Sequence, residues 1–259
     1  MKTLPNARFT VPMASLLLSL AGCTQTSPRT AVATAWDDAR QLVLVTTPDA
    51  DATQGRLRSF ERKGAGWQAV GDAIPVTVGR NGIAWGIGLH PAQPGLQKHE
   101  GDGRAPAGAF RIGTAFGYAP TAKTSLAYLA LTATHWCVDV SGAPDYNRIV
   151  DSRVVGESAV KDSTEPMRRD LHANGDQRYR LGFVIEHNPD RVAGAGSCIF
   201  AHLWKAPGES TAGCTAMAPA SMDRITGWLR PEAHPVFVQL TEADADRLRT
   251  AWQLPDRKD

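Results

Sequence analysis

The chain has 259 residues, with 28 lysines and arginines against 26 aspartates and glutamates, so its net charge is +2. No basic cluster alternates with aromatic side chains, which argues against a nucleic-acid partner. The histidines are dispersed and show no metal-ligand spacing, so we expect no metal site and no cofactor. A chain of this length suffices for one large β-rich domain with a sizeable core.

The N-terminal 22 residues have the features of a secretory signal peptide. Lys2 and Arg8 are followed by an apolar run that begins at Met13 and by small residues up to Cys23. The run is shorter than the roughly 20 apolar residues of a permanent transmembrane helix. Its end, Leu-Ala-Gly-Cys23, resembles a bacterial lipobox, which implies cleavage before Cys23 and attachment of a lipid to its thiol. An ordinary signal peptide that happens to end at a cysteine is the alternative.

The residues after Cys23 predict the localisation of the protein and the start of its folded domain. Thr24 stands at the position where an aspartate would favour retention of a lipoprotein at the inner membrane. The resemblance to lipoprotein sorting in Gram-negative bacteria therefore implies that the protein is anchored on the periplasmic side of the outer membrane. Residues 23–35 are rich in Thr, Ser, Ala and Pro without an apolar period, which predicts a flexible tether. Order should begin near Trp36, so we expect one folded domain over residues 36–259.

The first part of this domain is expected to be a β-meander. Short strand-like runs are separated by turn residues such as Pro48-Asp49 and Gly64-Ala-Gly66. The expected strands cover Gln41–Thr47, 57–62, 67–70 and 74–78. The glycine-rich block 79–117 then predicts loops and tight turns, and long loops on a β scaffold commonly frame a site.

The rest of the domain is also predicted to be mainly strands. These are expected over residues 110–112, 126–131, 138–140, 182–186, 199–202 and 236–240. Two helices are predicted, at residues 220–229 and at residues 242–252 after the potential N-cap Thr241. The sequence therefore predicts a mostly β fold with small peripheral helices.

The segment from Cys198 to residue 217 carries the strongest chemical signal, because it places His202 upstream of Cys214. A free thiol is mostly protonated at neutral pH, so a cysteine nucleophile needs a neighbouring imidazole or unpaired backbone N–H groups. Strand alternation puts Ile199 and Ala201 on one face and His202 on the other, where it can face a cleft. A buried structural thiol and a half-buried strand histidine are the alternatives.

This segment resembles the signature of the L,D-transpeptidase family with a YkuD-type catalytic domain, in which a Ser/Thr-His-Gly-Cys box follows a catalytic histidine. Thr211, Gly213 and Cys214 stand in the box, and His202 falls on the upstream histidine. Other stretches that resemble a subgroup of the family are Trp85-Gly-Ile-Gly, Glu100-Gly-Asp-Gly-Arg-Ala-Pro-Ala-Gly-Ala-Phe110 and Tyr146-Asn-Arg-Ile-Val-Asp151, so the likeness covers roughly residues 42–240. The resemblance implies a YkuD-like β-sandwich or barrel with small peripheral helices.

Two positions depart from the family pattern. The box histidine is Ala212, and the arginine that often follows the cysteine is replaced by Ala216. The segment between the histidine and the box is also shorter than in most members. Since that arginine is a natural partner for a peptide carboxylate, its absence suggests either a supply from Lys205 or a different acyl donor or acceptor. The alternative for Lys205 is a solvated surface side chain.

The four cysteines divide by expected role. Cys23 is the expected site of lipid attachment, and Cys214 is the expected nucleophile. The remaining cysteines, Cys137 and Cys198, would then lie in an oxidising compartment. A disulfide between them is the economical assignment, and it would hold the strand that leads into His202. Two buried thiols that never meet are the alternative, because the sequence gives no distance.

The remaining candidate residues have both a binding and a structural interpretation. Gly213 is expected to let its own amide and that of Cys214 point at a tetrahedral oxyanion. The Thr211 hydroxyl either binds substrate, orients the base or caps the turn. His187 and Asn188 are candidates for the wall of the cleft, and turn structure explains both about as well.

The resemblance implies a cysteine enzyme that transfers acyl groups on peptidoglycan stem peptides and so cross-links or remodels the cell wall. Cys214 would attack an amide carbonyl next to a D-amino acid, and His202 would protonate the leaving amine. The acyl acceptor would be another stem peptide, the amine of a wall-anchored protein, or water. The alternatives are a hydrolase, either an L,D-carboxypeptidase or an amidase that releases wall-linked protein, and a catalytically decayed wall-binding lipoprotein.

Overall fold

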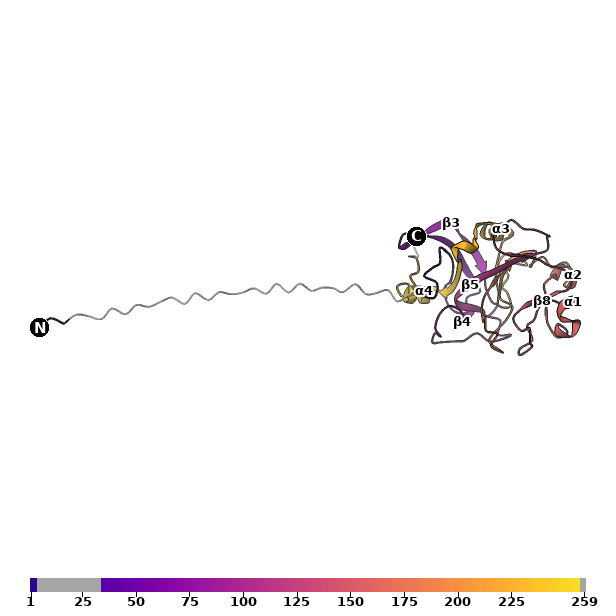
Figure 1. Ribbon diagram of the computed structural model, residues 1–259, viewed down its shortest axis with the longest axis horizontal. Coiled ribbons are helices and arrows are strands. Elements are labelled where there is room, and N and C mark those ends of the chain that lie inside the picture. The colour runs from indigo at the N-terminus through magenta and orange to yellow at the C-terminus, as the bar shows by residue number, and fades with distance from the viewer. Residues whose placement is uncertain (4–33, 257–259) are drawn as a thin grey trace. The chain divides into compact units, whose positions relative to one another are not determined.

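The computed structural model describes residues 1–3 and 34–256, and Figure 1 shows the arrangement of the helices and strands. Residues 34–256 belong to one folded unit. Cys23, with most of the predicted signal peptide and tether, lies outside the described residues. A search of the described helices for one long and apolar enough to cross a membrane finds none.

Eight strands of this unit close into a barrel. They are β1 (Gln41–Thr47), β2 (Gln54–Lys63), β3 (Gly66–Thr77), β5 (Ala105–Gly117), β10 (Leu181–Ile185), β11 (Phe200–Leu203), β12 (Thr215–Met217) and β13 (Val236–Thr241). The order of neighbours is β1-β2-β3-β12-β11-β10-β5-β13, and β13 pairs with β1 to complete the circle. The pairs β1–β13 and β11–β12 are parallel and the other barrel pairs are antiparallel.

Shorter elements surround the barrel. The strands β4 (Ile83–Trp85) and β6 (Tyr128–Ala130) each pair with β5. A small sheet has the order β8 (Ile149–Asp151), β7 (His135–Cys137), β9 (Glu165–Pro166). The helices are α1 (Ser152–Val155), α2 (Arg169–His172), α3 (Pro219–Trp228) and α4 (Glu242–Leu248), with 3-10 turns η1 (Glu157–Ala159) and η2 (Pro231–Ala233).

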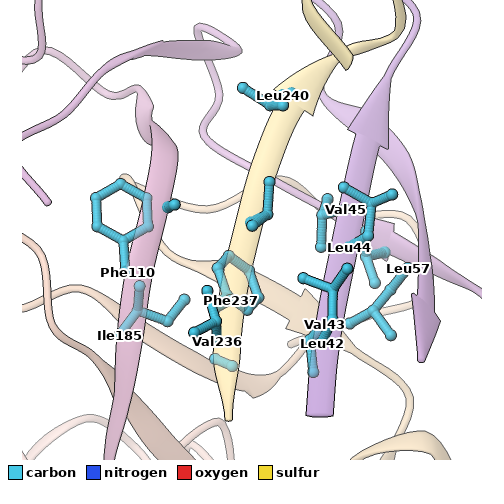
Figure 2. Close-up of a cluster of buried hydrophobic side chains, with 14 of the residues drawn as sticks. Leu42, Val43, Leu44, Val45, Leu57, Phe110, Ile185, Val236, Phe237 and Leu240 are labelled. Carbon is cyan, nitrogen blue, oxygen red and sulfur yellow. The ribbon is translucent and has the colours of Figure 1, made fainter. Parts of the chain in front are cut away.

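The barrel core is built from leucine, β-branched and aromatic side chains, and Figure 2 shows a cluster of them around β1, β13 and β5. Val43, Phe110 and Phe237 are fully buried. The strands β1 and β13 are buried along nearly their whole length, as continuous apolar runs require. Truncating one such side chain to alanine costs about 2–5 kcal/mol of stability. This packing gives the strands on the other side of the barrel a rigid support.

The predicted mostly β fold with small helices is confirmed. The first three strands form the expected antiparallel meander, and α3 lies within one residue of the predicted helix. Thr241 is the N-cap of α4, since its Oγ1 accepts a hydrogen bond from Asp244 N at 3.0 Å. The helix ends at Leu248 and not at residue 252, because the chain turns back there and packs the Trp252 ring edge-on against Trp36.

Two strand predictions differ from the structure in detail. The runs at residues 67–70 and 74–78 form the single strand β3, which contains Gly71 with φ of +67° and a register shift opposite Leu57–Ser59. The strand predicted at residues 138–140 is wrong, because the extended segment lies earlier, at β7. Its last residue, Cys137, is tied by a disulfide.

The glycine-rich block 79–117 was predicted as loops, and this is wrong for its second part. The long barrel strand β5 occupies residues Ala105–Gly117. Its glycines allow other groups to approach the strand closely, and a Cβ atom on Gly108 would lie 2.0 Å from His90 Nε2. Glycine density in this block therefore marks tight packing as well as turns.

Candidate active site

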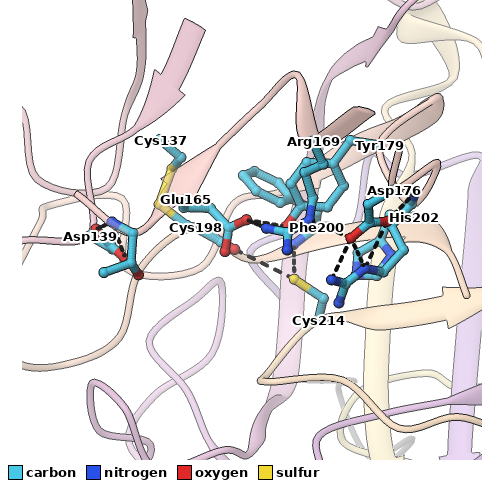
Figure 3. A network of polar contacts seen from close by, with 12 residues as sticks. Cys137, Asp139, Glu165, Arg169, Asp176, Tyr179, Cys198, Phe200, His202 and Cys214 are labelled. Carbon is cyan, nitrogen blue, oxygen red and sulfur yellow. Dashed lines mark hydrogen bonds and ion pairs between the residues drawn. A yellow bond between two sulfur atoms is a disulfide. The ribbon is translucent and has the colours of Figure 1, made fainter. Parts of the chain in front are cut away.

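His202 and Cys214 are brought together by two neighbouring strands. His202 lies on β11 opposite Ala216 of β12, and Cys214 directly precedes β12. Paired strands lie about 4.8 Å apart, so this register places the histidine next to the start of β12. Figure 3 shows both side chains in the same polar cluster. The register thus puts His202 and Cys214 on neighbouring strands, while the hydrogen-bond partners of Cys214 Sγ are Cys198 and Phe200.

The Cys214 thiol is buried, with 8% of the residue exposed. Its Sγ donates to the Cys198 carbonyl at 3.5 Å and accepts the Phe200 N–H at 3.4 Å. Burial, and then the Glu165 carboxylate, raises the pKa of Cys214 to about 12, against the lowering effects of the Phe200 N–H and of Lys98. The resting group is therefore a protonated thiol.

The His202 ring is neutral and its orientation is fixed. Nδ1 lies 2.7 Å from the Leu203 carbonyl, which can only accept, so Nδ1 carries the proton and Nε2 keeps its lone pair. The side of the ring packs edge-on against Tyr179 at 5.2 Å between centroids. Burial, with a smaller effect from Arg178 and Arg169, lowers the pKa of His202 to about 4. Such a ring can take a proton from a neighbouring thiol.

The turn before Cys214 is held by Thr211. The Thr211 Oγ1 donates to the Cys214 carbonyl at 2.6 Å and accepts the Gly213 N–H at 3.1 Å. This is the capping role that the sequence left open for Thr211. It also means that the expected use of the Gly213 amide for an oxyanion is not available in this structure, because that N–H already has a partner.

A half-buried cluster of charged side chains near His202 was not predicted from the sequence. Arg169 reaches Glu165 at 2.9 Å and Asp176 at 2.9 Å, and Arg178 reaches Asp176 at 2.5 Å. The Tyr179 hydroxyl donates to Glu165 at 2.8 Å, which joins the cluster to the ring that contacts His202. Figure 3 shows these groups around the histidine and the thiol. The sequence held no signal for them beyond the spacing Asp176-x-Arg178, because they meet only in the folded chain.

Lys98 is a second functional candidate that the sequence did not single out. Its side chain is 4% exposed, and its ammonium donates to Asp102 at 2.6 Å and to the His99 carbonyl at 2.9 Å. A Cβ atom on Gly213 would lie 3.8 Å from Nζ, so the ammonium faces the cysteine turn. Lys98 lies two residues before the segment from Glu100 to Phe110 that resembles the L,D-transpeptidase subgroup. This position in the sequence was the signal that could have identified Lys98 as a candidate.

The predicted disulfide between Cys137 and Cys198 is confirmed. The bridge joins the end of β7 to the chain just before β11. The Cys198 carbonyl accepts the hydrogen bond from Cys214, and the Cys198 N–H donates to Asn147 Oδ1 at 2.9 Å. The bridge therefore fixes a residue that contacts the thiol.

Three residues predicted to bind substrate have other partners. Lys205 is 63% exposed at its side chain and lies 3.8 Å from Glu209. His187 uses both ring nitrogens on backbone groups, Ile87 N and Ala195 O, and burial lowers its pKa to about 4. Asn188 is fully buried and bonds to the backbone of Val192 and Gly196. For His187 and Asn188 the structure thus supports the turn interpretation.

In comparisons with known proteins, no family model, no curated protein and no solved structure matches this chain. Over residues 1–3 and 34–256, no group of three His, Cys, Asp or Glu side chains is arranged to hold a metal ion. The chemistry of the site therefore has to be argued from its own geometry.

Proposed function

We propose that this protein is an exported cysteine acyltransferase that acts on peptidoglycan stem peptides, with Cys214 as the nucleophile and His202 as its base. The observation that carries the proposal is a protonated thiol just before β12 and a neutral imidazole of fixed tautomer on the neighbouring strand β11. The choice of stem peptides as substrates rests on the resemblance of the segment around Cys214 to the L,D-transpeptidases.

The proposed reaction has two halves. Cys214 Sγ forms a bond to the carbonyl carbon of the donor peptide, and the thiol proton passes to Nε2 of His202. When the tetrahedral intermediate collapses, the C–N bond breaks and the same proton goes to the leaving amine, which leaves an acyl-enzyme. An amine or a water molecule then attacks the thioester and gives its proton to His202, and the thiol is restored.

The tetrahedral oxyanion needs donors other than the Gly213 amide, which is bound to Thr211. Lys98 is suited to this task, because its ammonium faces the turn and has a third N–H beyond those used on His99 and Asp102. A preorganised charge in a buried site costs no reorganisation during the reaction. We assign the oxyanion to Lys98 and the Cys214 N–H.

The acceptor decides between the transferase and its alternatives. A second stem peptide gives a cross-link, a protein amine anchors that protein to the wall, and water gives the shortened stems of an L,D-carboxypeptidase or the released protein of an amidase. The replacements Ala212 and Ala216 are the features that favour a decayed wall-binding lipoprotein. The retained His202 and Cys214 favour an enzyme.

Incubation of the protein with purified sacculi, followed by muropeptide analysis, tests the proposal. New cross-links support the transferase, and shorter stems support the hydrolase. A Cys214→Ala variant is the matched control and should give neither product. If wild type and Cys214→Ala leave the same muropeptides, the chain is no acyl-transfer enzyme on this substrate. The predicted lipid anchor at Cys23 is a separate proposal that fractionation of membranes tests.

A further inference from the structure

A cavity of about 540 Å³ lies beside β11, on the side of the charged cluster. Trp204 and Lys205, which directly follow β11, form part of its wall, and the segment 173–178 with Arg169 forms the rest. The Leu203 N–H donates to the Arg178 carbonyl at 3.0 Å, so the wall is tied to the strand that carries His202. The cavity therefore lies beside the strand that carries His202, although neither His202 nor Cys214 lines it.

Cations outnumber carboxylates among the side chains that line this cavity, while Glu165 and Glu209 pair with Arg169 and Lys205 from outside the lining. Three cationic side chains, Arg169, Arg178 and Lys205, line it together with one carboxylate, Asp176. Asp176 is 8% exposed at its side chain, whereas Arg178 is 28% exposed and Arg169 17%. The cations thus present more surface to the cavity than the carboxylate does.

Asp176 holds the two guanidinium groups in place. Its carboxylate accepts from Arg178 Nε and Nη2 and from Arg169 Nε, while Arg169 Nη1 donates to Glu165. Within residues 34–256, Nη1 of Arg178 and Nη2 of Arg169 are the guanidinium nitrogens of this pair that have no hydrogen-bond partner. Two oriented donors next to a cavity match the oxygens of a carboxylate.

We infer that this cavity is an anion subsite that binds a carboxylate of the peptide substrate through Arg178 and Arg169 and so places the scissile amide beside Cys214. The Trp204 ring gives the subsite a partly apolar wall, as the aliphatic part of a peptide requires. Lys205 contributes long-range attraction from the cavity rim, because it is exposed. The substrate class rests on the proposed function, but the binding of a carboxylate does not.

The test measures binding without turnover. The full chain with Cys214→Ala is titrated with a stem tetrapeptide that has free carboxylates and with the same peptide fully amidated, by calorimetry or NMR. We expect the acid to bind better than the amide. Arg178→Gln should weaken binding of the acid by about 10- to 100-fold, the range for a charge-assisted hydrogen bond, and leave the amide unchanged. Arg180→Gln is the matched control, since Arg180 lies outside this cavity, and it should change neither peptide.

Further variants separate a loss of carboxylate binding from a loss of stability. Arg178→Gln removes bonds to Asp176, so its thermal melting is compared with that of Arg178→Lys, which keeps the charge. Lys205→Gln alters an exposed residue and should weaken binding of the acid a few-fold, with a steeper effect at low salt. Equal binding of acid and amide to the parent chain would overturn the inference, as would equal losses for both peptides in Arg178→Gln.

The outcome is separable from that of the proposed function. If the acid binds better than the amide and this preference depends on Arg178, the subsite inference is supported. If the wild-type chain at the same time forms no acyl-enzyme, the proposed transferase is wrong and the subsite still stands. An acyl-enzyme on Cys214 without such a preference keeps the transferase and removes the subsite.

Discussion

The burial of Cys214 predicts that the resting enzyme carries a neutral thiol and a neutral imidazole. The pKa values of about 12 for Cys214 and about 4 for His202 differ by 8 units, so transfer of the proton would cost about 11 kcal/mol before the new charges attract each other. Even two unit charges in direct contact, about 4 Å apart, would gain only about 4 kcal/mol at an effective dielectric constant of 20. The neutral pair is then favoured by at least about 7 kcal/mol, or about 10⁵-fold.

Alkylation by iodoacetamide measures this directly, because the thiolate is the reactive form. The rate at Cys214 should rise about tenfold per pH unit from pH 6 to pH 10, without a plateau near neutral pH. Mass spectrometry identifies the modified residue, and Cys214→Ala supplies the background. A rate that is already maximal at pH 7 would show a thiolate–imidazolium pair and would refute the reasoning.

The charges around the thiol allow a sharper version of the same assay. Glu165 raises the pKa of Cys214 and Lys98 lowers it. A unit charge about 7 Å away in a dielectric of about 20 contributes about 2 kcal/mol, or one to two pKa units. Glu165→Gln should therefore speed alkylation about 10- to 100-fold and Lys98→Met should slow it, whereas the exposed control Glu186→Gln should do neither. If Glu165→Gln slows alkylation, the assigned sign of its effect is wrong.

The remaining predictions concern the base, the bridge, the anchor and the stability. His202→Ala should lower acylation by about 10²–10⁴-fold, read from single-turnover rates, and an unchanged rate would place the base elsewhere. Replacing Cys137 and Cys198 by alanine should lower the free energy of unfolding by about 4 kcal/mol in urea titrations, since the bridge closes a loop with a separation of 61 residues; an unchanged midpoint would contradict this. Cys23→Ser should release the protein from the membrane fraction, and retention after a high-salt wash would exclude the lipid anchor. Stability should fall as pH drops from 6.5 to 4, because buried His187 and His202, each with a pKa of about 4, take up their protons more readily when unfolded. The share of His187 is about 3 kcal/mol, and an equal pH dependence in His187→Gln would refute its part in the loss.

The sequence predicted what depends on local pattern. The meander from β1 to β3, the helix α3 and the cap at Thr241 follow from alternation, periodicity and capping chemistry. The pairing of Cys137 with Cys198 followed from the number of cysteines left after two had other roles. Each of these needs information from a short stretch of chain or from a simple count.

What the sequence did not predict depends on pairing between distant segments. The barrel closes through β10 and β5, whose residues pair across a gap of more than 60 positions, and no local pattern encodes that register. The cluster of Glu165, Arg169, Asp176 and Arg178 consists of ordinary charged residues in a segment without periodicity. Because the chain folds these groups near β11, they become partly buried and influence the pKa values of His202 and Cys214.

Burial affects both the protonation of Cys214 and the strength of the charges around it. The same desolvation that keeps Cys214 protonated also makes each nearby charge effective, because the interaction between charges grows as water is excluded. A substrate carboxylate that occupied Arg178 and Arg169 would weaken the two cations that lower the pKa of His202. Its binding would therefore make His202 a stronger base at the moment when the thiol proton has to leave. In this way the anion subsite and the catalytic pair would act as one unit, because the bound carboxylate would offset the effect of Arg178 and Arg169 on the pKa of His202.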